Sequence, residues 1–279
     1  VFAYSGTATR PASASDTWTV NGRWEWGSGC RNATWISGGV ILCDSDGAPI
    51  LDKHQRPTEA RAFFKPDEIE MHDDWHTSGL RGSGSNSYTA HNLEIPDYRV
   101  ATVEALRASA LADSPIYRFP RFGYLALPIG SIALGMAHDA IEEALGIAKS
   151  KTPTGSSRSL ASRPAFHRDV ALAESSLRAA RSLFYKDIET AWDEAQKTAG
   201  SLETRRLLRT STVHAVTTAI DIIDRMYTTV GGSSVYEESA LQRHFRDVHV
   251  ASQHMMVAEP VMELAGRVMS GIDDQAPGL

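Results

Sequence analysis

The sequence predicts an α+β protein of two domains, an antiparallel β-barrel over residues 1–100 followed by a four-helix bundle over residues 101–279. Residues 1–100 hold short alternating apolar runs among many Gly, Ser and Thr residues, which is typical of strands joined by turns. The remaining residues hold long stretches with apolar side chains at helical spacing. A chain of 279 residues is long enough to bury two separate cores.

Five segments of the first half have strand patterns. In TWTVNGRWEW, residues 17–26, the Asn-Gly pair at 21–22 lies between two alternating runs and predicts a two-residue hairpin turn. Trp24 and Trp26 alternate within the second run, so we expect them on opposite faces of one strand. The other expected strands cover residues 34–43, 60–66, 69–76 and 88–96.

Four helices are expected in the second half, over residues 129–151, 165–196, 202–230 and about 237–260. In the third of these, apolar side chains form one stripe, and the glycine pair at 231–232 ends the helix. Four long antiparallel helices predict a bundle.

Composition excludes several classes of protein. The net charge of −6 argues against a nucleic-acid partner. No uninterrupted apolar run approaches the ~18 residues of a membrane span, so no membrane is expected. Cys30 and Cys43, the two cysteines, lie in strand-like segments and indicate a reducing, cytoplasmic compartment. His72 and His76 are four residues apart but in a strand-like segment, where they would not share a helical face, so we expect no metal site.

Two strings carry candidate chemistry. In GRWEWGSGC, residues 22–30, Ser28 lies between two glycines, where the backbone can approach a flat group, and Trp26 precedes it. In LQRHFRDVHVASQHMM, residues 241–256, His254 follows Arg246 by eight residues, about two helical turns on the same side. The plain alternatives are a strand edge with core tryptophans and a helix with a satisfied histidine.

The order and spacing of three strings resemble the acyl-CoA dehydrogenase superfamily over nearly the whole chain. They are GRWEWGSG with the following ATW, WHTSGLRGSGS with the following LEIP, and TTVGGSSVYEESALQRHFRD. The resemblance implies the middle β-barrel and the C-terminal bundle of that family, with flavin between them. The N-terminal helical domain of the family has no counterpart here, and the chain reads as the remainder of a longer protein.

The resemblance also implies roles for particular residues. Trp26 would cover the flavin ring and Ser28 would place its hydroxyl near N5. Gly231 and Gly232 would approach the nucleotide portion of a flavin from a neighbouring subunit, and Arg158 would reach the pyrophosphate. Arg121, which lies among aromatic residues, would favour a flavin or phenolate anion; its plain alternative is a surface arginine at a helix entry.

One position indicates the class of reaction. Many dehydrogenases of this superfamily have a catalytic glutamate eight residues after the Asp of an Arg-Asp pair, and counting from Asp247 gives Met255. A thioether cannot abstract a proton. With His254 beside it, the pattern resembles the reductase-dependent flavin monooxygenases, in which a histidine near the substrate acts on a phenolic proton.

The function expected from this resemblance is that of the oxygenase component of a two-component flavin-dependent monooxygenase. It would hydroxylate an aromatic, phenolic compound with O2 and reduced flavin, FADH2 or FMNH2, delivered by a separate flavin reductase. His254 and Ser28 are the expected catalytic residues, and a homotetramer is the expected assembly. The alternatives are an acyl-CoA dehydrogenase-like flavoprotein and an inactive truncated fragment.

Overall fold

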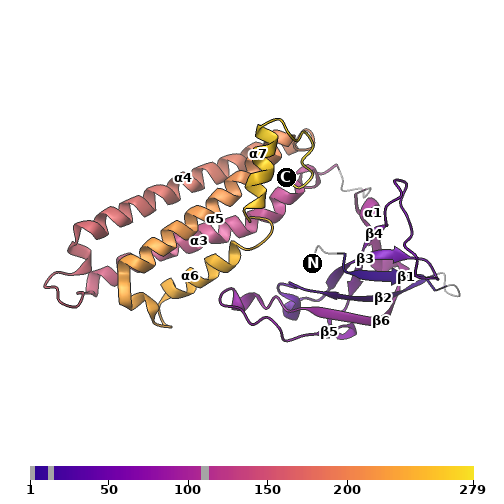
Figure 1. Cartoon of the computed structure of the whole chain (residues 1–279), viewed down its shortest axis with the longest axis horizontal. Coiled ribbons are helices and arrows are strands. Elements are labelled where there is room, and N and C mark those ends of the chain that lie inside the picture. Colours follow the sequence, from indigo (N-terminus) through magenta and orange to yellow (C-terminus); the bar gives the residue numbers. More distant parts are fainter. Residues whose placement is uncertain (1–3, 12–15, 108–112) are drawn as a thin grey trace. The chain divides into compact units, whose positions relative to one another are not determined.

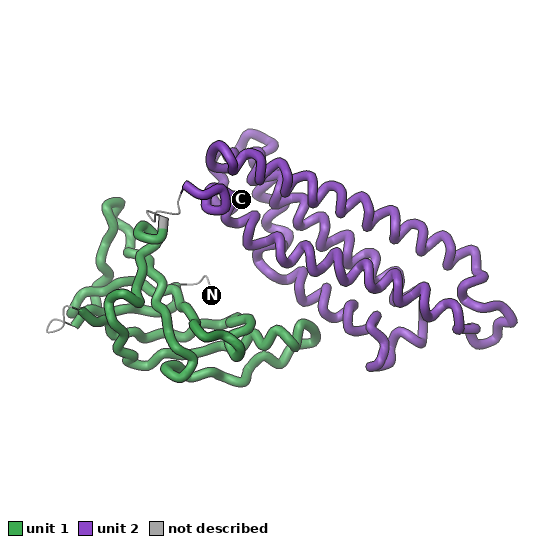
Figure 2. The backbone as a smooth tube through the Cα atoms, turned by 180° about the vertical axis from the view of Figure 1, so that it is seen from behind, with its two compact units in different colours: residues 1–112 green, residues 113–279 purple. Residues whose placement is uncertain are grey.

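The computed structural model describes residues 4–11, 16–107 and 113–279. They form two compact units, Val1–Ala112 and Asp113–Leu279, which are drawn in different colours in Figure 2 and are described separately below.

The first unit is built on one mixed sheet of seven strands in the order β5-β6-β2-β1-β3-β4-β7 (Figure 1). The strands are β1 (Gly6–Thr9), β2 (Thr17–Trp24), β3 (Ile36–Cys43), β4 (Glu59–Phe64), β5 (Glu70–Met71), β6 (Tyr88–Pro96) and β7 (Val100–Thr102). β1 runs antiparallel to β2 but parallel to β3. The predicted antiparallel barrel is therefore corrected: the described strands form a mixed sheet with an open order. Short 3-10 segments lie between several of the strands, and a short helix, α1 (Val103–Arg107), follows β7.

The predicted hairpin turn at Asn21-Gly22 is wrong, because β2 continues through both residues. Its partner β6 instead changes register there, pairing with Val20 and Gly22 on either side of the irregularity. Asn92 of β6 has φ 46°, and its backbone N–H donates to Oδ1 of Asn21 at 2.7 Å. Asn21 thus completes a β-bulge between β2 and β6. An Asn-Gly pair in such a bulge cannot be distinguished from one in a hairpin turn by the local sequence alone.

The indole of Trp24 occupies a slot made by glycines of three neighbouring strands. Its Nε1–H donates to the carbonyl of Gly39 at 2.9 Å, and the residue is fully buried. A Cβ added at Gly38 would lie 2.3 Å from the ring, and one added at Gly6 would lie 2.4 Å from it. Gly22 is similarly close, at 2.8 Å. The Trp24 ring therefore requires glycine at these positions, and Trp24 is the last residue of β2.

The second unit is a helical bundle with α5 at its centre (Figure 1). Its helices are α2 (Pro115–Arg118), α3 (Arg121–Ser150), α4 (Pro164–Ala195), α5 (Leu202–Val230), α6 (Ala240–Ala251) and α7 (Pro260–Met269). The hydroxyl of Ser201 accepts from the N–H of Thr204 at 3.2 Å and caps α5, and Gly231, at φ 69°, ends it.

The predicted four-helix bundle is corrected at its fourth helix. α6 ends at Ala251, and a separate helix, α7, begins at Pro260, so residues 252–259 turn instead of continuing the helix. This turn buries Met256 and Val257, which are 2% and 3% exposed. His254 lies in the turn, so its expected position two helical turns beyond Arg246 on one helix is wrong.

One described helix, α3, is long and apolar enough to cross a membrane by length and composition, with a mean hydropathy of 1.3 over its most apolar 18 residues. Core helices of water-soluble proteins have the same properties, and α3 packs against α5 and α6. Gly123 of α3 allows the approach to α5, because a Cβ there would lie 2.2 Å from Leu208, and Gly130 allows an approach to α4, because a Cβ there would lie 2.9 Å from Phe184.

We expect Gly38→Ala to lower the free energy of unfolding of the first unit by ~1–3 kcal/mol, because the new methyl group would overlap the Trp24 ring. Gly82→Ala is the matched control, since a Cβ there meets nothing within 4 Å. Urea unfolding followed by tryptophan fluorescence measures both. Equal stabilities of the two variants would contradict the glycine slot.

Candidate functional site

Trp26 and Ser28 lie on a loop that leaves the sheet directly after Trp24. Trp26 has φ 62°, the left-handed region, and is 58% exposed. The predicted strand alternation therefore stops at Trp24, although the two tryptophans do differ in burial. The ring of Trp26 meets that of Trp75 edge-on, with centroids 5.2 Å apart. A large side chain held in a left-handed conformation on the surface is a costly arrangement, and such strain concentrates at functional sites.

A second loop, residues 80–86, holds the Trp26 loop through the backbone. The N–H of Gly27 donates to the carbonyl of Asn86 at 3.1 Å, and the N–H of Gly29 donates to that of Ser83 at 2.9 Å. Leu80 in this loop also has a left-handed φ, of 51°. The two loops therefore form one rigid platform at the end of β2.

Three serine hydroxyls of this platform form a chain whose direction can be derived. Ser83 Oγ–H donates to the carbonyl of Leu80 at 2.7 Å, because a carbonyl can only accept. Ser83 must then accept from Ser85 at 2.8 Å, and Ser85 must accept from Ser28 at 2.8 Å. Ser85 is buried, whereas Ser28 is exposed. The hydroxyl of Ser28 therefore donates its hydrogen to Ser85 and presents only acceptor lone pairs to solvent.

Ser83 and Ser85 were missed as site residues in the sequence. They lie in LRGSGS, residues 80–85, which is equally typical of a tight turn. The signal that was available is the alternation of serine with glycine, which leaves the hydroxyls on one side of an irregular loop.

Gly231 and Gly232 lie at one end of the second unit beside an opening of about 730 Å³. Lys151 and Arg163 line the same opening, and Lys151 Nζ donates to the carbonyl of Val230 at 2.6 Å. Backbone glycines beside two cations suit a phosphate-bearing ligand.

Arg158 is not among the residues lining this opening. It is exposed, and its backbone N–H donates to the hydroxyl of Ser156 at 3.1 Å. Arg163, five residues later, lines the opening instead. Ser-rich loops give no periodic signal that shows which of the two arginines lines the opening.

His254 lies in the turn after α6, beside a buried arginine of α5. The backbone N–H of Met256 donates to Nδ1 of His254 at 3.2 Å. The pKa of His254 lies below the ordinary value, first because the surrounding protein displaces water from the ring, and second because Arg209 repels the proton. Arg209 is only 2% exposed, and its burial lowers its own pKa to about 10.

Arg121 and Met255 occupy the surface of the second unit. Arg121 lies in the first turn of α3, with its guanidinium carbon 5.8 Å from the centroid of the Phe122 ring. Met255 is 68% exposed, directly beside His254. A thioether thus occupies the position at which the dehydrogenase resemblance would require a carboxylate.

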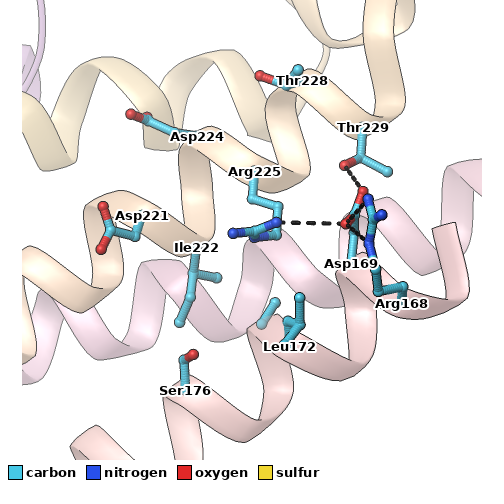
Figure 3. A pocket seen from close by; sticks show the side chains of 11 residues that line it. Arg168, Asp169, Leu172, Ser176, Asp221, Ile222, Asp224, Arg225, Thr228 and Thr229 are labelled. Atoms are coloured by element: carbon cyan, nitrogen blue, oxygen red, sulfur yellow. Dashed lines mark hydrogen bonds and ion pairs between the residues drawn. The ribbon is translucent and has the colours of Figure 1, made fainter. Parts of the chain in front are cut away.

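A second opening of about 680 Å³ lies between α4 and α5 (Figure 3). Asp169 accepts there from Arg168 at 2.9 Å and lies 3.5 Å from Arg225. Burial raises the pKa of Asp169, but its hydrogen bonds and these arginines lower it further, so it lies below its usual range. Asp169 is therefore paired with two cations of this groove.

Comparison with known proteins agrees with these features. Residues 127–259 match the family model described as acyl-CoA dehydrogenase, C-terminal domain. The chain is 30% identical to indole-3-acetate monooxygenase of Pseudomonas putida, over 90% of this chain and 62% of that protein. It is 28% identical to the oxygenase component of p-hydroxyphenylacetate 3-hydroxylase of Acinetobacter baumannii, over 91% of this chain and 60% of that protein.

The fold has a counterpart among solved structures. XiaF from Streptomyces sp., solved in complex with FADH2 and glycerol, superposes with a TM-score of 0.87 at 24% identity, over 100% of this chain and 70% of that one. The present chain thus spans under two thirds of the length of the two relatives above and shares the fold of this solved structure. Residues 127–259 are therefore similar to the acyl-CoA dehydrogenase C-terminal domain, and the relatives that the chain matches include a monooxygenase and the oxygenase component of a hydroxylase.

Proposed function

We propose that the chain is part of the oxygenase component of a two-component flavin-dependent monooxygenase that hydroxylates an aromatic, phenolic compound. Its two units would be the middle β domain and the C-terminal helical domain of the family. The names of the relatives support this reaction class, since they include an indole-3-acetate monooxygenase and a p-hydroxyphenylacetate 3-hydroxylase. A separate flavin reductase would supply reduced flavin, FADH2 or FMNH2, and the assembly would be a homotetramer. The buried free thiols of Cys30 and Cys43 suit a reducing, cytoplasmic compartment.

The direction of the serine chain is the observation that carries the proposal. Ser28 presents only acceptor lone pairs, so it suits a ligand that offers an N–H group. Reduced flavin carries a hydrogen on N5, whereas oxidised flavin has an acceptor there. The platform therefore fits the reduced cofactor, and the exposed ring of Trp26 offers a flat apolar surface beside it.

When bound, reduced flavin would supply the activation of dioxygen, and the protein residues would bind and orient. Lys151 and Arg163, with Gly231 and Gly232, would hold a phosphate of the nucleotide portion. Arg121 would favour an anionic ring, and His254 would contact the substrate. Met255 provides no base for α-proton abstraction, which disfavours the dehydrogenase reaction.

The reaction class is tested by supplying the chain with a flavin reductase, NADH, 18O2 and a panel of phenols. We expect a hydroxylated product carrying one 18O atom, detected by mass spectrometry. Acyl-CoA substrates should leave bound oxidised flavin unreduced when the reductase is omitted. Bleaching of the flavin by an acyl-CoA would instead indicate a dehydrogenase, and failure to bind either form of flavin would indicate an inactive fragment.

Ser85→Ala should weaken the preference for reduced over oxidised flavin by about 2- to 12-fold, the effect of one hydrogen bond of 0.5–1.5 kcal/mol. Without Ser85 to accept it, the proton of Ser28 can turn outward and donate to an oxidised N5. Anaerobic titrations with both flavin forms measure the ratio of the dissociation constants. Ser45→Ala, at an exposed serine of the same unit, is the control and should leave the ratio unchanged.

Arg163→Ala should weaken binding of FMN by about 10-fold or more while changing binding of riboflavin little, because hydrogen bonds to charged groups contribute about 1.5–3 kcal/mol. Riboflavin lacks the phosphate, so the difference between the two ligands isolates that contact. Arg158→Ala is the matched comparison from the same loop. A larger loss in Arg158→Ala than in Arg163→Ala would assign the phosphate to Arg158.

A further inference from the structure

We infer that His254 is held as the neutral Nε2–H tautomer and donates a hydrogen bond to the phenolic oxygen of the substrate, with Met256 and Arg209 as its positioning residues. The inference rests on the proposed function for its substrate, but the tautomer itself is a property of this chain alone. It departs from the family resemblance, which implies that this histidine takes up the phenolic proton.

The turn after α6 fixes the ring of His254 through its backbone. The N–H of His254 donates to the carbonyl of Ala251 at 3.1 Å, and the N–H of Val257 donates to the carbonyl of His254 at 2.8 Å. Between them, the N–H of Met256 donates to Nδ1 at 3.2 Å. A backbone N–H can only donate, so Nδ1 must keep its lone pair and the ring proton must lie on Nε2.

Arg209 fixes the same peptide segment from the other side. Its Nη1 donates to the carbonyl of Met256 at 2.6 Å and to that of Phe122 at 3.3 Å. Met256 is therefore held at both ends of its backbone, by Arg209 at the carbonyl and by His254 at the amide. Among the described residues, Arg209 forms no ion pair with a carboxylate, and its Nε has no hydrogen-bond partner.

An unneutralised buried cation changes the protonation of its neighbour. Arg209 remains charged at neutral pH, since its lowered pKa is still about 10. A second positive charge on His254 would be repelled in surroundings from which water is partly excluded. Burial and Arg209 both lower the pKa of His254, so the neutral ring predominates at pH 7.

The neutral tautomer limits what His254 can do. Its Nδ1 lone pair is occupied by the Met256 amide, and its Nε2 carries a proton, so neither nitrogen is free to accept one. His254 as a residue is exposed although its ring is partly desolvated, and among the described residues no hydrogen bond engages Nε2, so Nε2–H can donate to a ligand. A donor at that position stabilises the oxygen of a phenolate and orients the ring to be hydroxylated.

The tautomer is read directly from long-range 1H–15N correlation spectra of the chain labelled with 15N-histidine at pH 7. His254→Gln identifies the resonances by their loss. We expect Nε2 at a protonated, pyrrole-type shift and Nδ1 at an unprotonated, pyridine-type shift. A proton on Nδ1, or a doubly protonated ring, would overturn the inference. No flavin is needed, so this outcome is separate from the test of the reaction class.

The role of Arg209 is tested by titrating His254 in the same spectra. Arg209→Met should raise the pKa of His254 toward the ordinary value of about 6.5, and Arg209→Lys, which keeps the charge, should largely restore the lowered value. Arg225→Met removes a cation from another part of α5 and should change nothing. A folded Arg209→Met variant in which the pKa of His254 is unchanged would overturn the role assigned to Arg209. If that variant does not fold, a pKa of His254 that rises to the ordinary value in Arg209→Lys would overturn the same role, and the wild-type spectra still test the tautomer.

Discussion

The packing of Trp24 against glycine backbone is the constraint on which the first unit depends. Gly6, Gly22 and Gly38 belong to three adjacent strands, and each leaves room for the same indole ring. Because the ring also donates to Gly39, its position relative to the sheet is fixed. The chain leaves β2 directly after this residue. The positions of Trp26 and Ser28, two and four residues further on, therefore follow from a side chain that belongs entirely to the core.

The two units use the same device at their candidate sites. In each, a backbone group whose hydrogen-bonding role is fixed determines the role of a side chain that could otherwise donate or accept. The Leu80 carbonyl orients the serine chain and makes Ser28 an acceptor. The Met256 amide occupies Nδ1 of His254 and makes Nε2 a donor. Backbone peptide groups thus determine whether the Ser28 hydroxyl and His254 Nε2 act as a hydrogen-bond acceptor or donor.

Regular elements could be predicted from the sequence, and the irregular parts that carry the site could not. The strand at Tyr88–Pro96 and the helix ending at Val230 follow from alternation and helical periodicity. The prediction of a hairpin turn at Asn21-Gly22 failed because the residue that completes the bulge, Asn92, is 71 residues away in the sequence. His254 was placed on a helix because apolar spacing does not show that α6 ends at Ala251. Nothing in the sequence marks Arg209, because what sets it apart is that it is buried without a carboxylate partner, and this is visible only in the structure.

The left-handed backbone of Trp26 has a consequence for how this position changes during evolution. Glycine or asparagine would adopt φ 62° with less strain, and the difference is about 1–3 kcal/mol. Mutation under selection for stability alone would therefore remove the tryptophan, especially since its ring is mostly exposed and adds little to the core. A lineage that keeps tryptophan here is under selection for the ring itself. Its loss to glycine in a descendant would mark relaxed selection on the surface it presents, and that descendant would gain stability.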